Sequence, residues 1–317
     1  MTPLLHKKLL LTAAACLILS SCGQSDSTSD PANANPTAPN QTEANINVDD
    51  SGEASQGNAG TGANTTGSNA QQAPGNAATS GSTTLTGEDL PAPEPEPQLL
   101  YHINKAYNVV PNDEAADKKV VLLTFDDGPK EKKMIDGLID TLDKHEAKAI
   151  FFVNGYRVKE HPELLQLIAD RGQILGNHSW DHIDLKKESA ESMRKQIEDV
   201  QAIVKETTGE APRFFRPPFG SGNDTTHQIA DENGLIYMTW SNGSLDWDSK
   251  NKNKPEAVIA NVLEQLHAGS NILMHELPWT VEALDELLTK LEEKGYGFVD
   301  PRSIGPAPAV AGNGTSK

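Results

Sequence analysis

Aromatic side chains are scarce in this sequence: only 5% of its 317 residues are Phe, Trp or Tyr. None of them occurs before Tyr101. Large apolar side chains supply most of the surface that a folded domain buries, so the first hundred residues lack the means to form a core. The globular part of the chain is therefore expected after about residue 100, and the remaining length of about 200 residues suffices for one sizeable domain.

Basic residues are also few, with 27 Lys and Arg against 45 Asp and Glu, and the formal net charge is −18. The sequence has no long run of basic residues. This balance argues against nucleic acid as a partner and against charge-driven binding to anionic lipid. It fits a neutral or cationic partner, and we expect a monomer.

Cysteine occurs only twice, at Cys16 and Cys22. Both lie in a segment that begins with basic residues at 6–8 and continues with an apolar run over 9–19, too short to span a bilayer comfortably. Small residues then precede Cys22, and this pattern resembles the lipobox of bacterial lipoproteins. The resemblance implies cleavage before Cys22 and lipidation of its thiol, which leaves no cysteine for disulfides, metal ligation or catalysis. The alternative is an ordinary secretory signal with an incidental cysteine.

Residues 23 to about 97 are rich in Ser, Thr, Asn, Gln, Gly, Ala and Pro and show no apolar period. Such a composition predicts a disordered linker that can act as a tether. We therefore expect a lipoprotein signal peptide over 1–21, the lipidated Cys22 with a linker over 22–100, a folded domain over 101–305, and a disordered tail over 306–317. The expected location is the bacterial cell envelope, outside the cytoplasm and anchored to a membrane.

Strand-like and helix-like segments alternate after residue 100. Apolar runs predict strands at 120–125, 149–153, 173–177, 214–216, 235–239, 270–274 and 297–299. Apolar positions at helical spacing predict helices at 132–145, 162–170, 190–207, 224–233, 255–267 and 281–294. This alternation predicts an α/β fold with a parallel sheet covered by helices, either open or closed as a barrel. In such folds the chemical groups gather at the carboxyl ends of the strands.

Two adjacent carboxylates, Asp126 and Asp127, follow the first of these strands. Buried neighbouring carboxylates repel each other and lose water, and a metal ion would offset that cost. Two imidazoles, His178 and His182, follow a later strand, either at helical spacing or on a tight loop. Asp127, His178 and His182 would suit zinc, or another first-row ion such as cobalt, with a position left open for water. Asp126 would then be free to act as a general base. Taken separately, the acidic pair also fits a turn, and the histidine pair a solvated loop.

Three further segments add chemistry to this candidate site. Arg216, flanked by aromatic residues and prolines, would hold Asp126 ionised and oriented, unless it is a surface arginine. His275 ends an apolar strand, and Asp246 would stabilise its imidazolium and set its tautomer, which suits a proton donor to a leaving group. Trp247 offers an apolar wall for a methyl group or a sugar face. Alternatively, His275 is a structural histidine and Trp247 a tryptophan of the core.

These five segments, in this order, resemble the polysaccharide deacetylases of carbohydrate esterase family 4, the NodB homology domain, over about residues 118–300. The resemblance implies a distorted (β/α) barrel with about seven parallel strands over the domain at 101–305. It also implies these roles: general base for Asp126, metal ligands for Asp127, His178 and His182, a tether for the base at Arg216, an oxyanion N–H from Phe219, tuning of the general acid His275 by Asp246, and an acetyl pocket lined by Trp247 and Leu273.

Two positions depart from the family pattern. The fourth segment often begins with another aspartate where this chain has Gly243, and a tyrosine is more common at Phe219. Phe219 lacks the phenol but keeps the main-chain donor. We expect the departure at Gly243 to affect the fit of the substrate more than activity.

The implied reaction is metal-dependent de-N-acetylation of an N-acetylglucosamine-containing polysaccharide, and the expected anchor and tether favour cell-wall peptidoglycan. Chitooligosaccharides, poly-N-acetylglucosamine and acetylxylan are alternative substrates. A different class of function is a lipoprotein that binds glycan without turnover. A metal-transport lipoprotein would have a closed site without a general acid, and the pair formed by Asp246 and His275 argues against it.

Overall fold

The structure, a computed structural model, describes residues 98–307. The expectations for the signal peptide, for lipidation of Cys22, and for nearly all of the linker and the tail fall outside these residues. Within 98–307, no helix combines the length and the apolarity needed to cross a bilayer.

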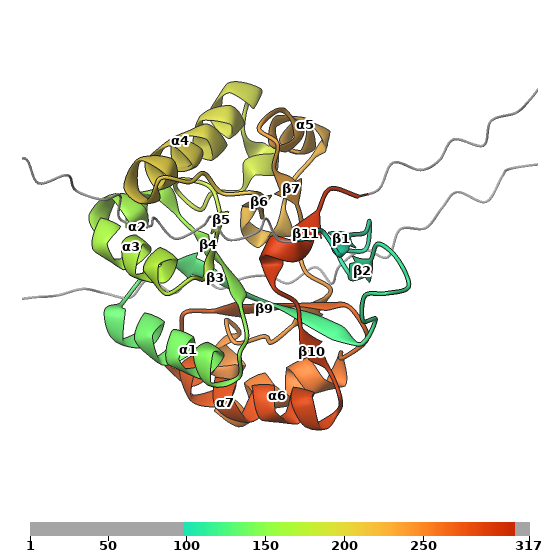
Figure 1. The fold of residues 1–317 in the computed structure, drawn as a ribbon. Helices are drawn as coiled ribbons and strands as arrows, with labels where there is room; N and C mark the ends of the chain where they lie inside the picture. Colours follow the sequence, from blue (N-terminus) through green and yellow to red (C-terminus); the bar gives the residue numbers. More distant parts are fainter. Residues whose placement is uncertain (1–97, 308–317) are drawn as a thin grey trace, which may run out of the picture. The chain divides into compact units, whose positions relative to one another are not determined.

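The main sheet of the described region contains eight strands, and every pairing in it is parallel. Its order is β7 (Ile236–Tyr237), β6 (Phe214–Phe215), β5 (Ile174–Asn177), β4 (Ala149–Val153), β3 (Val120–Gly128), β9 (Ser270–His275) and β8 (Asn242–Gly243). A further strand, β10 (Gly297–Phe298), pairs with β3 off this path. The seven strands curl into a half-barrel with β7 and β8 at its edges (Figure 1). The prediction of a distorted (β/α) barrel with about seven parallel strands is confirmed.

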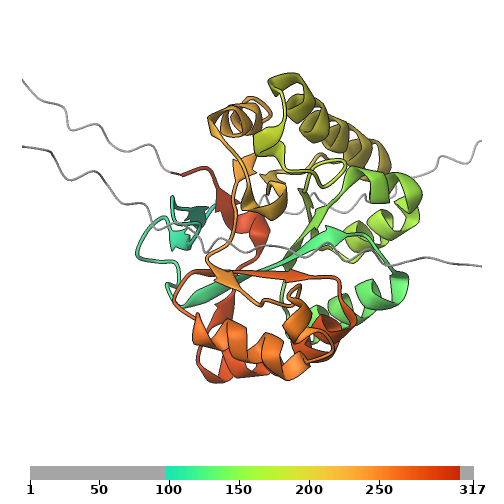
Figure 2. The same ribbon diagram turned by 180° about the vertical axis from the view of Figure 1, so that it is seen from behind.

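Helices cover the outer face of this sheet (Figures 1 and 2). They are α1 (Lys132–Lys144), α2 (Gly155–Glu160), α3 (Pro162–Asp170), α4 (Ala190–Thr208), α5 (Asp224–Glu232), α6 (Pro255–Glu264) and α7 (Pro278–Glu293). Short 3₁₀ turns are formed by Leu185–Lys187, Pro218–Gly220, Ser249–Asn251 and Pro301–Ser303. The apolar stripe of α1 is buried as its spacing predicts, and it packs with Val121, Leu123 and Phe125 of β3.

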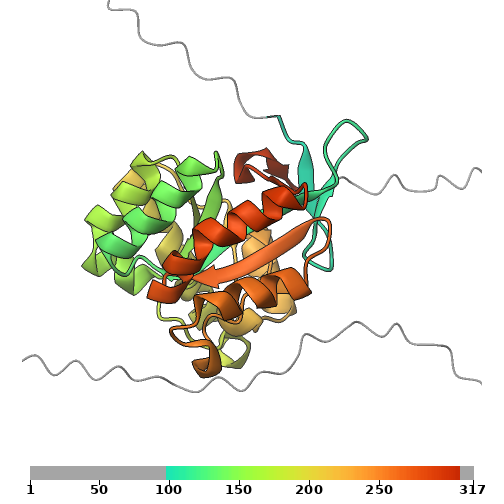
Figure 3. The same ribbon diagram turned by 90° about the horizontal axis from the view of Figure 1, so that it is seen from below.

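The alternate residues of β3 face the inside of the curl. Val120 and Leu122 belong to a second apolar cluster with Phe152 and Met238. A small sheet in the order β11 (Ile304–Gly305), β1 (Tyr101–Ile103), β2 (Val109–Pro111) joins the same cluster (Figure 3). The Val109 N–H donates to the Gly269 carbonyl and the Gly269 N–H to that of Val120, so the small sheet lies at the amino ends of β3 and β9. The inside of the curl therefore has an apolar floor, and its carboxyl end is left for polar groups.

Several elements of the domain were not predicted from the sequence. They are β1, β2, β8, β11 and α2. The four strands have two or three residues each and α2 has six, too few for a period to show. β3 runs to Gly128 rather than to residue 125, and α7 begins at Pro278 rather than at 281, with the proline in the first turn where it is favoured.

Candidate active site

Polar side chains gather at the carboxyl ends of β3, β5 and β9. Asp126 of β3 lies opposite His275 of β9 in the sheet register. His178 directly follows β5, and its N–H donates to the carbonyl of Val153 at the end of β4. Sheet pairing thus brings together groups that lie as much as 149 positions apart along the chain, from Asp126 to His275.

The end of β3 is irregular, and this irregularity shapes the site. Adjacent residues of a regular strand point to opposite faces of the sheet. Here the pairing of β3 with β4 shifts register between Phe125 and Gly128, and Asp127 has a φ of 65°. As a result, Asp126 Oδ2 and Asp127 Oδ1 lie 3.6 and 3.5 Å from the same atom, Nε2 of His178. Both neighbouring carboxylates therefore serve one site.

Asp127, His178 and His182 form a group with potential metal-ligating atoms within 4.8 Å of one another. His182 Nε2 lies 3.1 Å from Asp127 Oδ1, a buried oxygen that makes no well-formed hydrogen bond. His178 Nδ1 lies 2.7 Å from the Arg216 carbonyl. A carbonyl only accepts, so Nδ1 carries a proton, and Nε2 is the nitrogen that faces the cluster and would bind a cation. The side chains fit a divalent cation with an Asp-His-His ligand set.

The charge of Asp127 suits this use. Burial raises the pKa of the Asp127 carboxyl, but the imidazoles of His178 and His182 that face it outweigh burial and hold this pKa well below its usual value. Lys130 and His275 add to the lowering through their charges. The Asp127 carboxyl is thus ionised at neutral pH, the form that a metal ligand needs.

A loop rather than a helix carries the two histidines. Ser179 and His182 both have positive φ angles, 64° and 54°. The Asn154 amide donates to the His178 carbonyl at 2.7 Å, and Gln196 accepts the Asp181 N–H at 2.8 Å. Of the two arrangements that the sequence left open, the tight loop is the one found.

Arg216 is fully buried and holds Asp126. Its Nη1 donates to Asp126 Oδ1 at 2.7 Å and to the hydroxyl of Thr124 at 2.8 Å. The other side of the guanidinium donates to the Thr239 carbonyl and to the Asn271 side chain. Burial lowers the pKa of Arg216 and the charge of Asp126 opposes this. Because Oδ1 of Asp126 is held by Arg216, Oδ2 is the oxygen that faces His178.

His275 and Asp246 form the pair that the sequence predicts. His275 Nδ1 lies 2.8 Å from Asp246 Oδ1, and Asp246 Oδ2 accepts the backbone N–H of His275 and the hydroxyl of Thr280, each at 2.7 Å. Burial lowers the pKa of His275, but Asp246 more than offsets this, and with the charges of Asp127 and Asp126 it raises the pKa to about 9. His275 is therefore a protonated imidazole at neutral pH.

Apolar side chains surround these groups. The Trp247 ring lies edge-on to His275 at a centroid distance of 5.3 Å, and buried Leu273 precedes His275 on β9. Phe219 is 45% exposed, has a φ of 59°, and packs edge-on against the His182 ring at 4.7 Å. At Gly243, an added Cβ would lie 3.3 Å from the Trp247 ring. The aspartate common at this family position would therefore press against that ring.

Sequence reasoning missed several residues that support the site. They include Thr124, Asn154, Trp240, Asn271, Glu276 and Thr280. Two of them carried a signal: Thr124 shares a strand face with Asp126, and Asn271 interrupts an apolar strand. The others act through tertiary contacts that no local pattern reveals.

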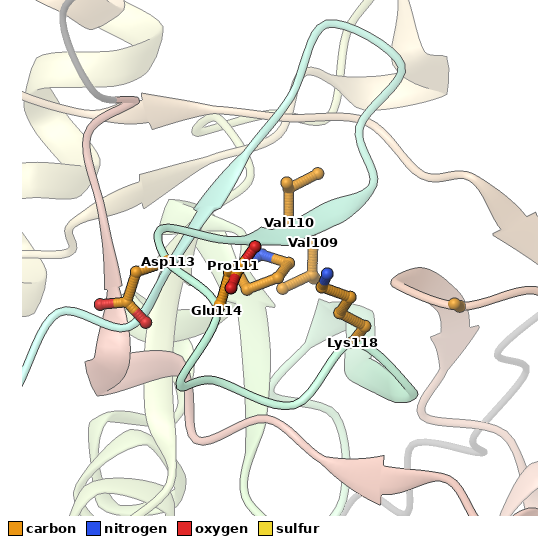
Figure 4. A pocket seen from close by; sticks show the side chains of 7 residues that line it. Val109, Val110, Pro111, Asp113, Glu114 and Lys118 are labelled. Atoms are coloured by element: carbon orange, nitrogen blue, oxygen red, sulfur yellow. The ribbon is translucent and has the colours of Figure 1, made fainter.

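A surface hollow of about 430 Å³ lies elsewhere, next to β2 (Figure 4). Its lining residues are Val109, Val110, Pro111, Asp113, Glu114, Lys118 and Ala268. Val109 is hydrogen-bonded to Gly269, which is bonded in turn to Val120 at the amino end of β3, and Asp126 lies about 20 Å farther along that strand. The hollow is therefore separate from the candidate active site.

The curled parallel sheet thus brings an Asp-His-His cluster together with a tethered carboxylate and a carboxylate–imidazole pair, a set of groups that suits metal-assisted hydrolysis. The sequence pattern of the polysaccharide deacetylase family matches residues 113–238. Peptidoglycan deacetylase PdaC from Bacillus subtilis, a solved structure, is 35% identical with a TM-score of 0.52, and the match covers 58% of this chain and 88% of that one. The chain belongs to the polysaccharide deacetylase family.

Two further relatives bear on function. Peptidoglycan-N-acetylglucosamine deacetylase PgdA from Listeria monocytogenes is 37% identical over 220 residues, which are 66% of this chain and 46% of PgdA. The chain thus matches about half the length of that relative. A carbohydrate esterase family 4 pseudoenzyme from Bacillus anthracis is 32% identical with a TM-score of 0.54, covering 60% of this chain and 64% of that one. The family therefore includes a member described as a pseudoenzyme.

Proposed function

We propose that this chain removes N-acetyl groups from an N-acetylglucosamine-containing polysaccharide, cell-wall peptidoglycan, in a metal-dependent hydrolysis. The observation that carries the proposal is the Asp127, His178 and His182 cluster, with the tethered Asp126 and the protonated His275 beside it. The activities named for PgdA and PdaC, which both act on peptidoglycan, support the substrate class.

Asp127, His178 and His182 would hold the metal, Zn²⁺ or a similar ion such as Co²⁺. When bound, the ion would supply a Lewis acid that polarises the N-acetyl carbonyl and eases deprotonation of water. The proton on His178 Nδ1 keeps Nε2 available for it.

The chain's own groups would carry the protons. Asp126 Oδ2 takes a proton from the attacking water while Arg216 holds Oδ1. The Phe219 N–H stabilises the oxyanion of the tetrahedral intermediate. His275 donates a proton from Nε2 to the departing nitrogen, and the products are acetate and a free amine. Trp247 and Leu273 enclose the acetyl methyl group.

Peptidoglycan carries two N-acetylated sugars, and relatives of both kinds are known by name. PgdA is an N-acetylglucosamine deacetylase, and PdaC is called an N-acetylmuramic acid deacetylase. A lipid anchor at Cys22 would keep a monomeric domain in the bacterial cell envelope, outside the cytoplasm and within reach of the wall. Chitooligosaccharides, poly-N-acetylglucosamine and acetylxylan remain the alternative substrates.

Acetate release from peptidoglycan, chitin oligomers and acetylxylan, measured side by side with and without a chelator, tests the proposal. We expect the fastest release from peptidoglycan and its loss on chelation. Asp126→Asn should lower turnover by about 10²–10⁴-fold, the usual contribution of a general base. Asp136→Asn, which removes an exposed carboxylate paired with Lys132, is the control and should leave turnover unchanged. Turnover that survives Asp126→Asn contradicts the assigned base.

A glycan-binding protein without turnover is the second candidate, and the Bacillus anthracis pseudoenzyme is the observation that favours it. It predicts binding of N-acetylglucosamine oligomers with no acetate released by any metal-loaded sample. Against it, all positions of the proposed mechanism are occupied by suitable side chains.

A further inference from the structure

Glu276 is a buried carboxyl group that the proposed mechanism does not use. It directly follows His275 at the end of β9 and is only 1% exposed. Acidic side chains are almost never buried so completely unless they are paired or have a task. Its contacts show what it holds.

The carboxylate of Glu276 lies against the segment that follows the two aspartates. Its Oε2 accepts the backbone N–H of Lys130 at 2.9 Å. A Cβ placed on Gly128 would be only 1.9 Å from Oε1, so the carboxylate packs directly on the glycine backbone. Oε1 itself has no hydrogen-bond partner within the described part of the chain. Glu276 thus joins the end of β9 to the segment Gly128–Lys130.

This segment sets the conformation of a proposed metal ligand. Asp127 precedes Gly128 and has a φ of 65°, a left-handed conformation that non-glycine residues adopt only when the surroundings impose it. The charge of Asp127 also acts on Glu276. Burial raises the pKa of Glu276 to about 7, and the charge of Asp127 contributes to the rise. A side chain placed here is able to control where the Asp127 carboxylate points.

We propose that Glu276 is a positioning residue that holds Asp127 in its metal-binding conformation by fastening Gly128–Lys130 to the carboxyl end of β9. The inference rests on the proposed metal-dependent function. Two consecutive residues at the end of β9 would then serve the site. His275 would be the general acid, and Glu276 would orient a metal ligand on β3. An apolar side chain at 276 would leave the Lys130 N–H without its acceptor.

Calorimetric titration of the full chain with Co²⁺, after removal of bound metal, tests this inference. Glu276→Ala should raise the Kd for Co²⁺ about 10–100-fold, the usual effect of removing a residue that orients a ligand. Glu276→Gln keeps an oxygen that accepts the Lys130 N–H, so its Kd should stay within about threefold of wild type. The visible absorption of bound Co²⁺ should change in Glu276→Ala and not in Glu276→Gln, because it reports ligand geometry.

Gln173→Ala is the matched control. Gln173 is also buried, accepts the backbone N–H of Ala149 at 2.9 Å, and has one side-chain atom without a partner. It lies at the amino end of β5, away from the site, and its loss should leave the Kd for Co²⁺ unchanged. If Glu276→Ala fails to fold, Glu276→Asp, which draws the carboxylate back by one methylene, should bind Co²⁺ more weakly than Glu276→Gln.

The inference is overturned if Glu276→Ala, or Glu276→Asp where the alanine variant does not fold, binds Co²⁺ as tightly as wild type. It is equally overturned if Gln173→Ala weakens binding as much. Acetate release by the wild type is measured in parallel. A wild type that binds Co²⁺ but releases no acetate overturns the proposed deacetylation alone, whereas a wild type that binds no ion overturns both.

Discussion

At the scale of single residues, the candidate site depends on which side chains hold protons at neutral pH. Burial raises the pKa of Asp127, but the two histidines lower it by more, so Asp127 is ionised. Burial lowers the pKa of His275, but Asp246 raises it by more, so His275 is protonated. Asp246 has no oxygen to spare, since Oδ1 faces the His275 ring and Oδ2 accepts two further hydrogen bonds. The pair is thus built to keep a proton on His275.

The pH dependence of the reaction follows from this pair. A general acid must be protonated, so kcat/KM should fall as pH rises through the pKa of His275, which is about 9 before the charge of a bound cation lowers it. Asp246→Asn removes the charge that raises this pKa, and the alkaline limb should move to lower pH. A pH–rate profile of both proteins checks this.

Asp248→Asn is the control for this profile, because Asp248 lies on the same loop but only caps a short turn, accepting the Lys250 N–H. Its profile should match the wild type. The role given to His275 is wrong if the alkaline limb stays in place in Asp246→Asn. The same pair stabilises the folded chain below about pH 6.5, and this contribution is lost as pH rises through about 9.

At the scale of elements, one side chain links the end of β6 to β3 and β9, two strands that do not pair with β6. Arg216 follows β6 and donates to Thr124 and Asp126 on β3, to Thr239 beyond β7, and to Asn271 on β9. Its guanidinium also stacks over Phe152 of β4, with 4.3 Å to the ring centroid. Arg216 therefore fills the inside of the curled sheet directly above its apolar floor.

Removing this connection should destabilise the domain. Arg216→Ala leaves Asp126 buried without its arginine. Breaking a buried ion pair in this way lowers the free energy of unfolding by about 3–5 kcal/mol. Arg213→Ala, which removes a part-buried arginine bonded to the Ile304 carbonyl, should cost about 1 kcal/mol. Urea unfolding of both variants in the presence of a chelator measures the difference, and equal costs would contradict the bracing role.

The contact between the two sheets depends on a glycine. Gly269 has a φ of 79°, and a Cβ there would lie 2.2 Å from the Val109 carbonyl oxygen on β2. Gly209 at the end of α4 has a similar φ of 89° but open space around it. Gly209→Ala should therefore lower the free energy of unfolding by about 1 kcal/mol through backbone strain alone, and Gly269→Ala should lower it clearly more. Thermal unfolding of the two variants compares them. Similar melting temperatures would show that β2 can move away from an added Cβ at little cost in stability.

At the scale of the whole domain, the described chain begins and ends at the opposite side from the site. β1 and β11 pair with each other next to the amino ends of the main strands, while Asp126, His178 and His275 lie at the carboxyl ends. All proposed site residues come from residues 98–307 except the lipidation site.

Metal binding should stabilise this domain as a unit. A ligand at 100 times its Kd that binds only the folded state adds about 2.7 kcal/mol, which corresponds to about 5–10 °C in Tm for a domain of this size. Thermal unfolding with added Zn²⁺ and with chelator measures the shift. His178→Ala should abolish it, whereas His161→Ala, at an exposed histidine, should not. An equal shift in both variants would place the ion elsewhere.

The sequence by itself determined the class of fold, the main helices and the candidate residues for the site, because strand period, helix period and motif spacing are local properties. Helices α1, α3, α4, α5 and α6 begin at their predicted residues, and strand β4 has its predicted bounds. Order along the chain and position after a strand were enough to propose four of the site residues from the sequence, namely Asp126, Asp127, His178 and His182.

Only the tertiary structure decided how these residues act together. The shift in β3 that turns two adjacent carboxylates toward one histidine breaks the period that predicted the strand. The hydrogen bonds of Arg216 and the position of Glu276 on Gly128 join segments far apart in sequence. Such contacts depend on close packing between strands, and a single sequence carries no local record of them.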